Sequence, residues 1–276
     1  PSSPARDAGL VVRRYGDAGP RVAVLHGGPG APGSVASLAE ALADPCQVLE
    51  PLQRRSGDTP LTVAQHVEDL TAVVTEPLHL VGWSWGAMLA LSFTVAHPEV
   101  VRSLALVGCG TYDTDAREQY DQAMKARLDA DDRAVLKTLT DQIEASGDAG
   151  NEALLTERGR LWNQLLSVDL IKHDRNEFPE DPEGRRQTWD DVLRLQQEDV
   201  EPAAFTSIRV PVAMFHGTDD PHPGHATYAT LRQHIPQVTY QQFSRCGHVP
   251  WLERHARDDF LRALHQWIET NERNQN

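Results

Sequence analysis

The feature that most constrains the fold of this chain is the pentapeptide Gly-Trp-Ser-Trp-Gly at residues 82–86, together with the segments on either side of it. Residues 78–81 form a short apolar run, which predicts a buried strand. Residues 87–96 are apolar on nearly every face, which predicts a helix packed against the middle of a sheet. At a sharp turn between two such elements, a serine hydroxyl projects from the carboxyl edge of the sheet, and flanking glycines avoid collisions with neighbouring backbone. The alternative interpretation is an ordinary turn flanked by glycines.

The rest of the sequence predicts one large α/β domain with an insertion. Short strands alternate with helices up to residue 107, a rhythm typical of βαβ units in a mostly parallel sheet. A charged, helix-forming block follows, and the strands resume at Val210. We therefore predict a mostly parallel central sheet flanked by helices, with an inserted helical cap. The predicted segments are an N-terminal core (1–110), the helical cap (111–205) and a C-terminal core (206–276).

Periodicity and turn residues place the individual elements. Ser34 and Thr62 are the predicted N-caps of the first two helices. Strands are predicted at 10–14, 21–25, 47–50, 78–81, 104–107, 210–215 and 238–243, and helices at 35–42, 63–74, 87–96, 116–128, 133–143, 152–170, 187–198 and 226–234, with a last amphipathic helix through Leu261 and Trp267.

Composition excludes several classes of partner. The 276 residues include 26 basic and 40 acidic side chains, which gives a formal net charge of −14. Such a surface repels the phosphates of nucleic acids and anionic membrane surfaces. No stretch approaches the roughly 20 apolar residues of a membrane span, and the first residues lack the apolar core of a secretion signal. We expect a small-molecule substrate and neither a nucleic-acid nor a membrane partner; the oligomeric state stays open.

The cysteines indicate the redox compartment. Cys46, Cys109 and Cys246 are three, so they cannot all pair within the chain. Reduced thiols in a cytoplasmic protein are the expected interpretation, and a single disulfide with one free thiol is the alternative.

Two later segments supply partners for the serine. A serine hydroxyl needs a base, and the base needs an orienting acid; in an open parallel sheet these follow later strands in the order serine, acid, histidine. Asp219 and Asp220 follow one predicted strand, and His248 follows the next. We therefore predict a triad of Ser84, Asp220 and His248, with Asp219 as the alternative acid and a surface histidine as the alternative for His248.

A glycine-rich segment, His-Gly-Gly-Pro-Gly at 26–30, also follows a strand. Its backbone N–H groups and that of Trp85 are placed to form an oxyanion hole. A phosphate-binding loop is the alternative, but no Gly-Lys-Ser/Thr follows. Residues 216–225 are rich in histidine and aspartate, yet they lack helical metal-ligand spacing, so we predict no metal site. Trp83 and Trp85 are candidates for an apolar wall of the substrate pocket, with packing as the alternative.

From about residue 10 to 269 the chain resembles the α/β-hydrolase superfamily. HGGPG together with GWSWG looks most like its proline iminopeptidase branch and esterase-like relatives. In that pattern the acid stands three residues after a glycine, which Asp220 matches. The resemblance assigns the oxyanion donors to Gly28 and Trp85, and implies a cis bond between Gly28 and Pro29.

The resemblance is incomplete in two places. The family commonly has Asp-x-Arg-Gly-x-Gly-x-Ser in the loop after the third strand, whereas residues 52–59 read LQRRSGDT, without the leading aspartate and the first glycine. Iminopeptidases hold the substrate amine with cap glutamates. Candidates exist here, but a solvated acidic face is the simpler interpretation; they are Glu177, Glu180, Glu183, Glu198 and Glu201.

These patterns predict a serine hydrolase that needs no cofactor and cleaves an ester, lactone or amide bond of a small, largely apolar substrate. Acidic residues outnumber basic ones between residues 112 and 201, so we expect neutral or cationic substrates to be favoured. The alternatives are an iminopeptidase-type aminopeptidase and a non-catalytic, hydrolase-like ligand-binding protein.

Overall fold

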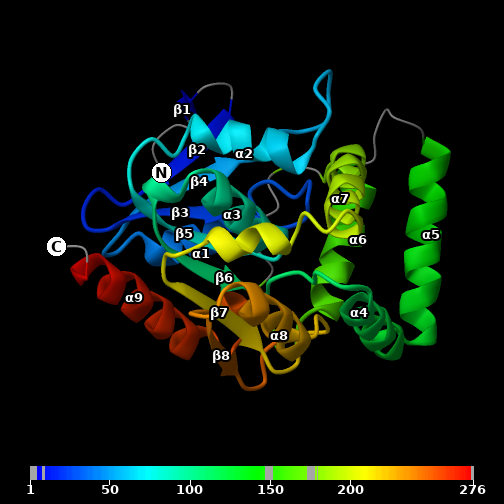
Figure 1. Ribbon diagram of the computed structural model, residues 1–276. Helices are drawn as coiled ribbons and strands as arrows, with labels where there is room; N and C mark the ends of the chain where they lie inside the picture. The colour runs from blue at the N-terminus through cyan, green and yellow to red at the C-terminus, as the bar shows by residue number, and fades with distance from the viewer. Residues whose placement is uncertain (1–4, 8–9, 147–151, 173–177, 179, 275–276) are drawn as a thin grey trace.

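The computed structural model describes residues 5–7, 10–146, 152–172, 178 and 180–274. Within them, eight strands form one sheet in the order β1-β2-β4-β3-β5-β6-β7-β8 (Figure 1). The pairs β1–β2 and β2–β4 are antiparallel and all the others are parallel. The strands are β1 (Ala5–Asp7), β2 (Leu10–Tyr15), β3 (Arg21–Leu25), β4 (Gln47–Leu52), β5 (Leu78–Trp83), β6 (Val101–Val107), β7 (Val212–Gly217) and β8 (Thr239–Phe243).

Helices cover both faces of the sheet. On one face, α1 and α9 pack on apolar side chains such as Val24 and Val107. On the other face, α2, α3 and α8 pack on side chains such as Leu80 and Leu106. Apart from the cap, the helices are α1 (Ala36–Leu42), α2 (Val63–Thr71), α3 (Trp85–Ala96), α8 (Gly224–His234) and α9 (Arg257–Arg273), with 3-10 turns at Pro98–Val100, Ala203–Ser207 and Pro250–Leu252. The predicted fold class is confirmed.

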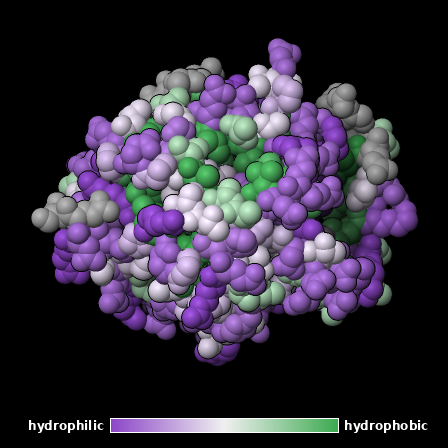
Figure 2. Space-filling model, viewed as in Figure 1, coloured by the Kyte–Doolittle hydropathy of each residue, from purple (hydrophilic) through white to green (hydrophobic). Residues whose placement is uncertain are grey.

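Within the described residues, four α-helices separate β6 from β7 in the chain. They are α4 (Thr114–Arg127), α5 (Ala130–Ser146), α6 (Glu152–Leu165) and α7 (Pro182–Gln197), and they stand together beside one end of the sheet (Figure 1). Figure 2 shows a mainly hydrophilic surface on this side of the molecule, with apolar atoms visible in the hollow between α5 and the α6–α7 pair. The segment boundaries at 110 and 205 remain a prediction.

The helices and strands lie close to where the sequence predicts them, but some of their ends differ. Thr62 caps α2, since its hydroxyl accepts a hydrogen bond from the backbone N–H of Gln65 at 3.1 Å. Ser34 is not an N-cap: α1 begins at Ala36 after Val35, which makes no capping bond, and the hydroxyl of Ser34 has no partner in the described part of the chain. The predicted end of α6 at residue 170 is also wrong. The helix stops at Leu165, because the following backbone bonds to the loop around Glu253.

Among the helices of the described residues, none combines the length and the apolar character that crossing a membrane requires.

Candidate active site

Ser84 lies at the turn between β5 and α3, as predicted. Its backbone has φ of 55° and ψ of −118°, a conformation that a non-glycine residue adopts only where the surroundings enforce it. The enforcement is steric. A Cβ added to Gly82 would lie 2.3 Å from the carbonyl oxygen of Gly86, and one added to Gly86 would lie 2.2 Å from that of Leu25. Both glycines are therefore required for strand, turn and helix to approach this closely.

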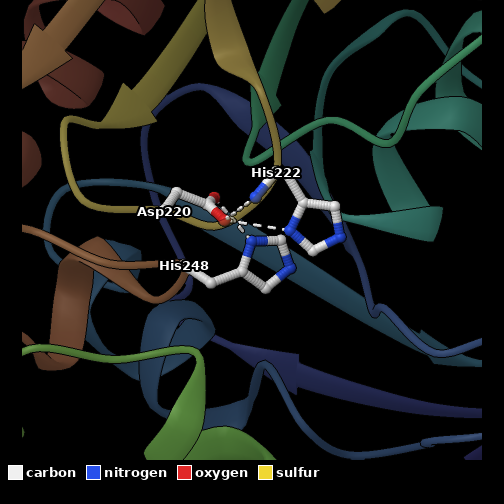
Figure 3. Close-up of side chains that lie close together, drawn as sticks. All are labelled: Asp220, His222 and His248. Carbon is white, nitrogen blue, oxygen red and sulfur yellow. Dashed lines mark hydrogen bonds and ion pairs between the residues drawn. The ribbon is translucent and has the colours of Figure 1, made fainter. Parts of the chain in front are cut away.

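His248 and Asp220 meet at the carboxyl edge of the sheet. Asp220 follows β7 and His248 follows β8, and the Nδ1 of His248 lies 2.7 Å from the Oδ2 of Asp220 (Figure 3). Both side chains are buried, the carboxylate completely. The neighbouring Asp219 is exposed and accepts a hydrogen bond from the Thr218 hydroxyl instead. Ser84 and His248 line the same cavity, and within the described residues no hydrogen bond joins them.

Sequence analysis missed a second histidine on the same carboxylate. His222 directs its Nδ1 and its backbone N–H to the Oδ1 of Asp220, each at 2.9 Å. Its ring stacks on that of His248, with 4.2 Å between the centroids (Figure 3). A third histidine, His216, also lies close to the carboxylate, with its Nε2 3.3 Å from Oδ2. We call Asp220, His222 and His248 the Asp220 cluster.

The surroundings keep Asp220 ionised. Burial alone would raise the pKa of its carboxyl, but the imidazoles of His248, His216 and His222 lower the pKa well below the ordinary value. Burial and the neighbouring His248 lower the pKa of His222. The carboxylate therefore has His222 on Oδ1 and both His248 and His216 on Oδ2, and the short contact with Oδ2 fixes Nδ1 of His248 as a hydrogen-bond donor.

Three groups of the Asp220 cluster each offer one ligand atom within 4.8 Å of the others, a spacing that fits a metal ion. The same atoms already bond to one another as donors and acceptors, which accounts for the arrangement without a metal. The expectation of a metal-free site remains a prediction.

Glu253 anchors the loop that carries His248. Its carboxylate is completely buried and accepts hydrogen bonds from three backbone N–H groups, of Gly247 (3.0 Å), Val168 (2.9 Å) and Asp169 (2.8 Å). The backbone N–H of His248 donates to the carbonyl of Leu166 at 2.9 Å. The histidine loop is thus fastened to the segment that follows α6, which couples the core to the helical cap.

The glycine-rich loop lies beside the serine. Gly28 lines the cavity with φ of +115°, and its bond to Pro29 is cis, as the resemblance implies. Gln53 holds this loop in place, and it lies in the segment 52–59, where the sequence departs from the family pattern. The Gln53 amide donates to the His26 carbonyl at 3.0 Å, and its oxygen accepts from the Trp85 indole N–H at 2.8 Å. Gln53 therefore links the glycine-rich loop to the serine turn.

The two tryptophans beside the serine differ in position. Trp83 lines the cavity, and its indole N–H donates to the carbonyl of His248 at 2.9 Å, so it both walls the pocket and supports the histidine. The Trp85 ring is 2% exposed and packs against His66 in the core. Its backbone N–H belongs to the first residue of α3, directly after Ser84.

A cavity of about 350 Å³ is lined by Ser84, by other residues at the sheet edge and by residues of the predicted cap. The core contributes Gly28, Ala31, Ser34, Trp83, Ser84, His222 and His248, and the cap contributes Tyr120, Leu136, Thr140, Arg158, Gly159, Trp162, Asn163, Leu166, Glu180 and Arg185. Of these, the sequence singled out Gly28, Trp83, Ser84, His248 and Glu180. The other cap residues carry no local motif; they come from α4, α5, α6, the residue that follows α6, and α7, and they meet only in three dimensions.

Comparisons with known proteins agree with this fold. Residues 20–254 match the family model of the alpha/beta hydrolase fold. The chain is 29% identical over 265 residues to the pimeloyl-[acyl-carrier protein] methyl ester esterase of Chromobacterium violaceum, covering 95% of this chain and 98% of that protein. It is 22% identical over 288 residues to the proline iminopeptidase of Lactobacillus helveticus, covering 92% and 91%.

Solved structures share the fold. The proline iminopeptidase of Mycobacterium smegmatis superposes with a TM-score of 0.65 at 22% identity over 99% of both chains. An esterase from Exiguobacterium antarcticum superposes with a TM-score of 0.67 at 16% identity over 94% of this chain and 95% of that one.

Proposed function

We propose, on the premise that this chain belongs to the alpha/beta hydrolase fold family, that it is a serine hydrolase which cleaves an ester, lactone or amide bond of a small, largely apolar substrate. The observation that carries the proposal is the contact of 2.7 Å between His248 and Asp220 beside a serine held at a strained strand-to-helix turn. Both glycine-flanked segments border the same cavity.

The proposed reaction is acyl transfer to water. The hydroxyl oxygen of Ser84 attacks the substrate carbonyl while Nε2 of His248 takes its proton. The imidazolium formed is stabilised by Asp220 and then protonates the leaving group as the bond to the carbonyl carbon breaks. Water, deprotonated by the same histidine, attacks the acyl-enzyme and releases the acid and the free serine.

The negative oxygen of each tetrahedral intermediate needs donors. The backbone N–H groups of Gly28 and Trp85 are the proposed pair, one from the glycine-rich loop and one from the N-terminus of α3. Removal of one such donor typically costs about 3–4 kcal/mol in the transition state. The family chemistry needs no cofactor, and the proposal includes none.

The test is covalent labelling. Wild-type protein is expected to hydrolyse p-nitrophenyl acetate and butyrate and to react with a fluorophosphonate probe, and Ser84→Ala is expected to lose both activities. Ser92→Ala is a matched control, since that serine lies buried within α3 with its hydroxyl bonded to Glu201 at 2.6 Å. Labelling that persists in Ser84→Ala would remove Ser84 from the mechanism.

An aminopeptidase that removes N-terminal proline is the second candidate. Two observations favour it: curated relatives include proline iminopeptidases, and Glu180 of the cap lines the cavity, where a carboxylate is able to hold a substrate amine. Against it, Glu180 is engaged with Arg158 at 3.4 Å. Parallel assays of a proline arylamide and of short p-nitrophenyl esters separate the two. Faster turnover of the arylamide would establish the peptidase.

A non-catalytic, ligand-binding protein is the third candidate. Tight binding of a small apolar ligand, with neither ester turnover nor probe labelling, would favour it over both hydrolases.

A further inference from the structure

The charges that line the cavity differ from those of the cap as a whole. The cap carries an acidic excess, yet outside the Asp220 cluster the charged side chains that line the cavity, among the described residues, are two arginines and one glutamate, namely Arg158, Arg185 and Glu180. The glutamate and Arg158 neutralise each other across 3.4 Å. Of these three described charges, the positive charge of Arg185 is left over.

Arg185 has no counter-ion among the described residues. No carboxylate in the described part of the chain lies within ion-pair distance of it, whereas the adjacent Arg186 pairs with both Glu183 (2.7 Å) and Asp190 (3.0 Å). Arg185 also stands in the first turn of α7, where the helix dipole disfavours a cation. An unpaired guanidinium in that position is a site for an anion.

The start of α7 is fixed beside the proposed oxyanion loop. The backbone N–H of Asp181 donates to the carbonyl of Gly30 at 2.9 Å. A Cβ added to Gly30 would lie 3.4 Å from the Cβ of Arg185. An anion on Arg185 would therefore bind next to the loop that carries Gly28, within the same cavity as the reacting carbonyl.

Tyr120 supplies a neutral donor next to this charge. Its ring lies on His222, 4.3 Å between centroids. Tyr120 and Arg185 line the same cavity, so the phenol hydroxyl is available to a ligand that binds beside the guanidinium. Burial raises the pKa of Tyr120 to about 12, so the phenol keeps its proton.

Ser34 also lines the cavity, and among the described residues its Oγ has no hydrogen-bond partner. That oxygen is buried, so an unpaired polar group lies beside the cavity, which is costly.

We propose that Arg185, with the hydroxyl of Tyr120, binds a carboxylate of the substrate, so that this enzyme prefers esters or amides whose acyl chain ends in a free carboxylate. The inference rests on the proposed serine-hydrolase function and names its substrate class. The planar guanidinium suits a carboxylate, which it bonds through two parallel N–H groups.

This preference is opposite to the one that the acidic cap predicts. At physiological ionic strength, exposed charges are screened beyond about 8 Å. A charge-assisted bond inside a cavity escapes most of that screening, because little water separates the partners. The side chains that line the cavity therefore decide the preference, and the net charge of the cap has a smaller influence.

The experiment compares two series of p-nitrophenyl esters. One is made from linear dicarboxylic acids of four to eight carbons with the far carboxylate free, and the other has that carboxylate capped as a methyl ester. Wild-type kcat/KM, corrected for spontaneous hydrolysis, is expected to favour the free acid by about tenfold or more at the chain length that spans from Ser84 to Arg185. Arg185→Gln is expected to abolish the preference by lowering kcat/KM for the free acid roughly 10- to 100-fold, with the capped ester unchanged. Tyr120→Phe is expected to weaken the preference by several-fold.

Arg186→Gln is the matched control, because it removes the same charge one residue away at a side chain that is 61% exposed and already paired. It is expected to change neither series. Equal losses in Arg185→Gln for free and capped esters, or wild-type turnover without preference, would overturn the carboxylate site. Fluorophosphonate labelling of Ser84 would then still support the hydrolase.

Calorimetric titration with the free dicarboxylates tests the site without turnover. Binding that weakens in Arg185→Gln but not in Arg186→Gln supports it even where no ester is cleaved. Equal affinity in both variants overturns it.

Discussion

Replacing Asp220 by asparagine tests the centre of the proposed mechanism, and the structure shows which way the new amide would turn. The Oδ1 position accepts from the backbone N–H of His222, a donor that cannot be reoriented, while Oδ2 faces Nδ1 of His248. In the Asp220→Asn protein the oxygen of the new amide therefore takes the Oδ1 position, and its NH₂ group faces His248. A donor at that point forces Nδ1 to accept, which places the ring proton on Nε2.

That tautomer has no lone pair on Nε2 with which to take the proton of Ser84. In hydrolases with this triad, the same inversion lowers kcat by about 10⁴-fold, which corresponds to about 5 kcal/mol of transition-state stabilisation. We expect a loss of this size for Asp220→Asn. Asp219→Asn is the matched control: its carboxylate is exposed and bonds only to Thr218, so activity should stay within about threefold of wild type.

The assay is steady-state hydrolysis of p-nitrophenyl butyrate, with the rate of fluorophosphonate labelling as an independent measure of serine nucleophilicity. Circular dichroism melting curves check that both variants fold. Near-wild-type activity in a folded Asp220→Asn protein would refute the tautomer argument, and a larger loss in Asp219→Asn would move the acid to that residue.

Three further predictions concern stability and metal ions. Glu253→Gln leaves one acceptor oxygen for three backbone donors, so it should lower the free energy of unfolding by about 2–4 kcal/mol and also lower kcat. Glu68→Gln, at an exposed position, is the control and should change neither quantity. Urea denaturation and ester assays measure the two effects. Burial lowers the pKa of His26 and of His66 to about 4, below the value of about 6.5 in the unfolded chain. Between these two pH values the unfolded state therefore binds more protons than the folded state. The free energy of unfolding should fall by about 3 kcal/mol per histidine as the pH drops from 6.5 to 4. His66→Gln should flatten the slope of unfolding free energy against pH, and an unchanged slope would contradict the assignment. Dialysis against EDTA should leave ester hydrolysis unchanged, and activity restored only by added metal would instead show that the Asp220 cluster works with a metal ion.

Sequence reasoning located the elements because the strongest signals are local. The strand–serine–helix pattern depends on two glycines whose need is visible in the crowding around Ser84. The strand before Asp220 is a short buried run, and the strand before His248 is a short run bounded by turn residues. In a parallel sheet, residues that follow neighbouring strands meet at one edge, so chain order alone brings these side chains together. The fold and the proposed triad were therefore within reach of the sequence.

The parts that sequence reasoning missed depend on long-range contacts. Ser34 has the residue type of an N-cap, but its hydroxyl lines the cavity and α1 starts after Val35. The helical periodicity after Glu152 continues past Leu165, yet the helix stops there because Glu253, far along the chain, bonds to the backbone of the next residues. Neither competing interaction has a local signature.

The charge of the cap shows the same difference between composition and position. A count of acidic and basic residues treats Arg185 and Arg186 alike, although Arg186 is neutralised on the surface and Arg185 faces the cavity without a counter-ion among the described residues. Net charge describes the field far from the protein, where many side chains add, whereas a substrate in a cavity of about 350 Å³ interacts with the few charges within reach of it. The proposed preference for charged substrates therefore depends on which side chains remain unpaired. Arg158 of α6 is paired with Glu180, whereas Arg185 lies where the start of α7 contacts the glycine-rich loop.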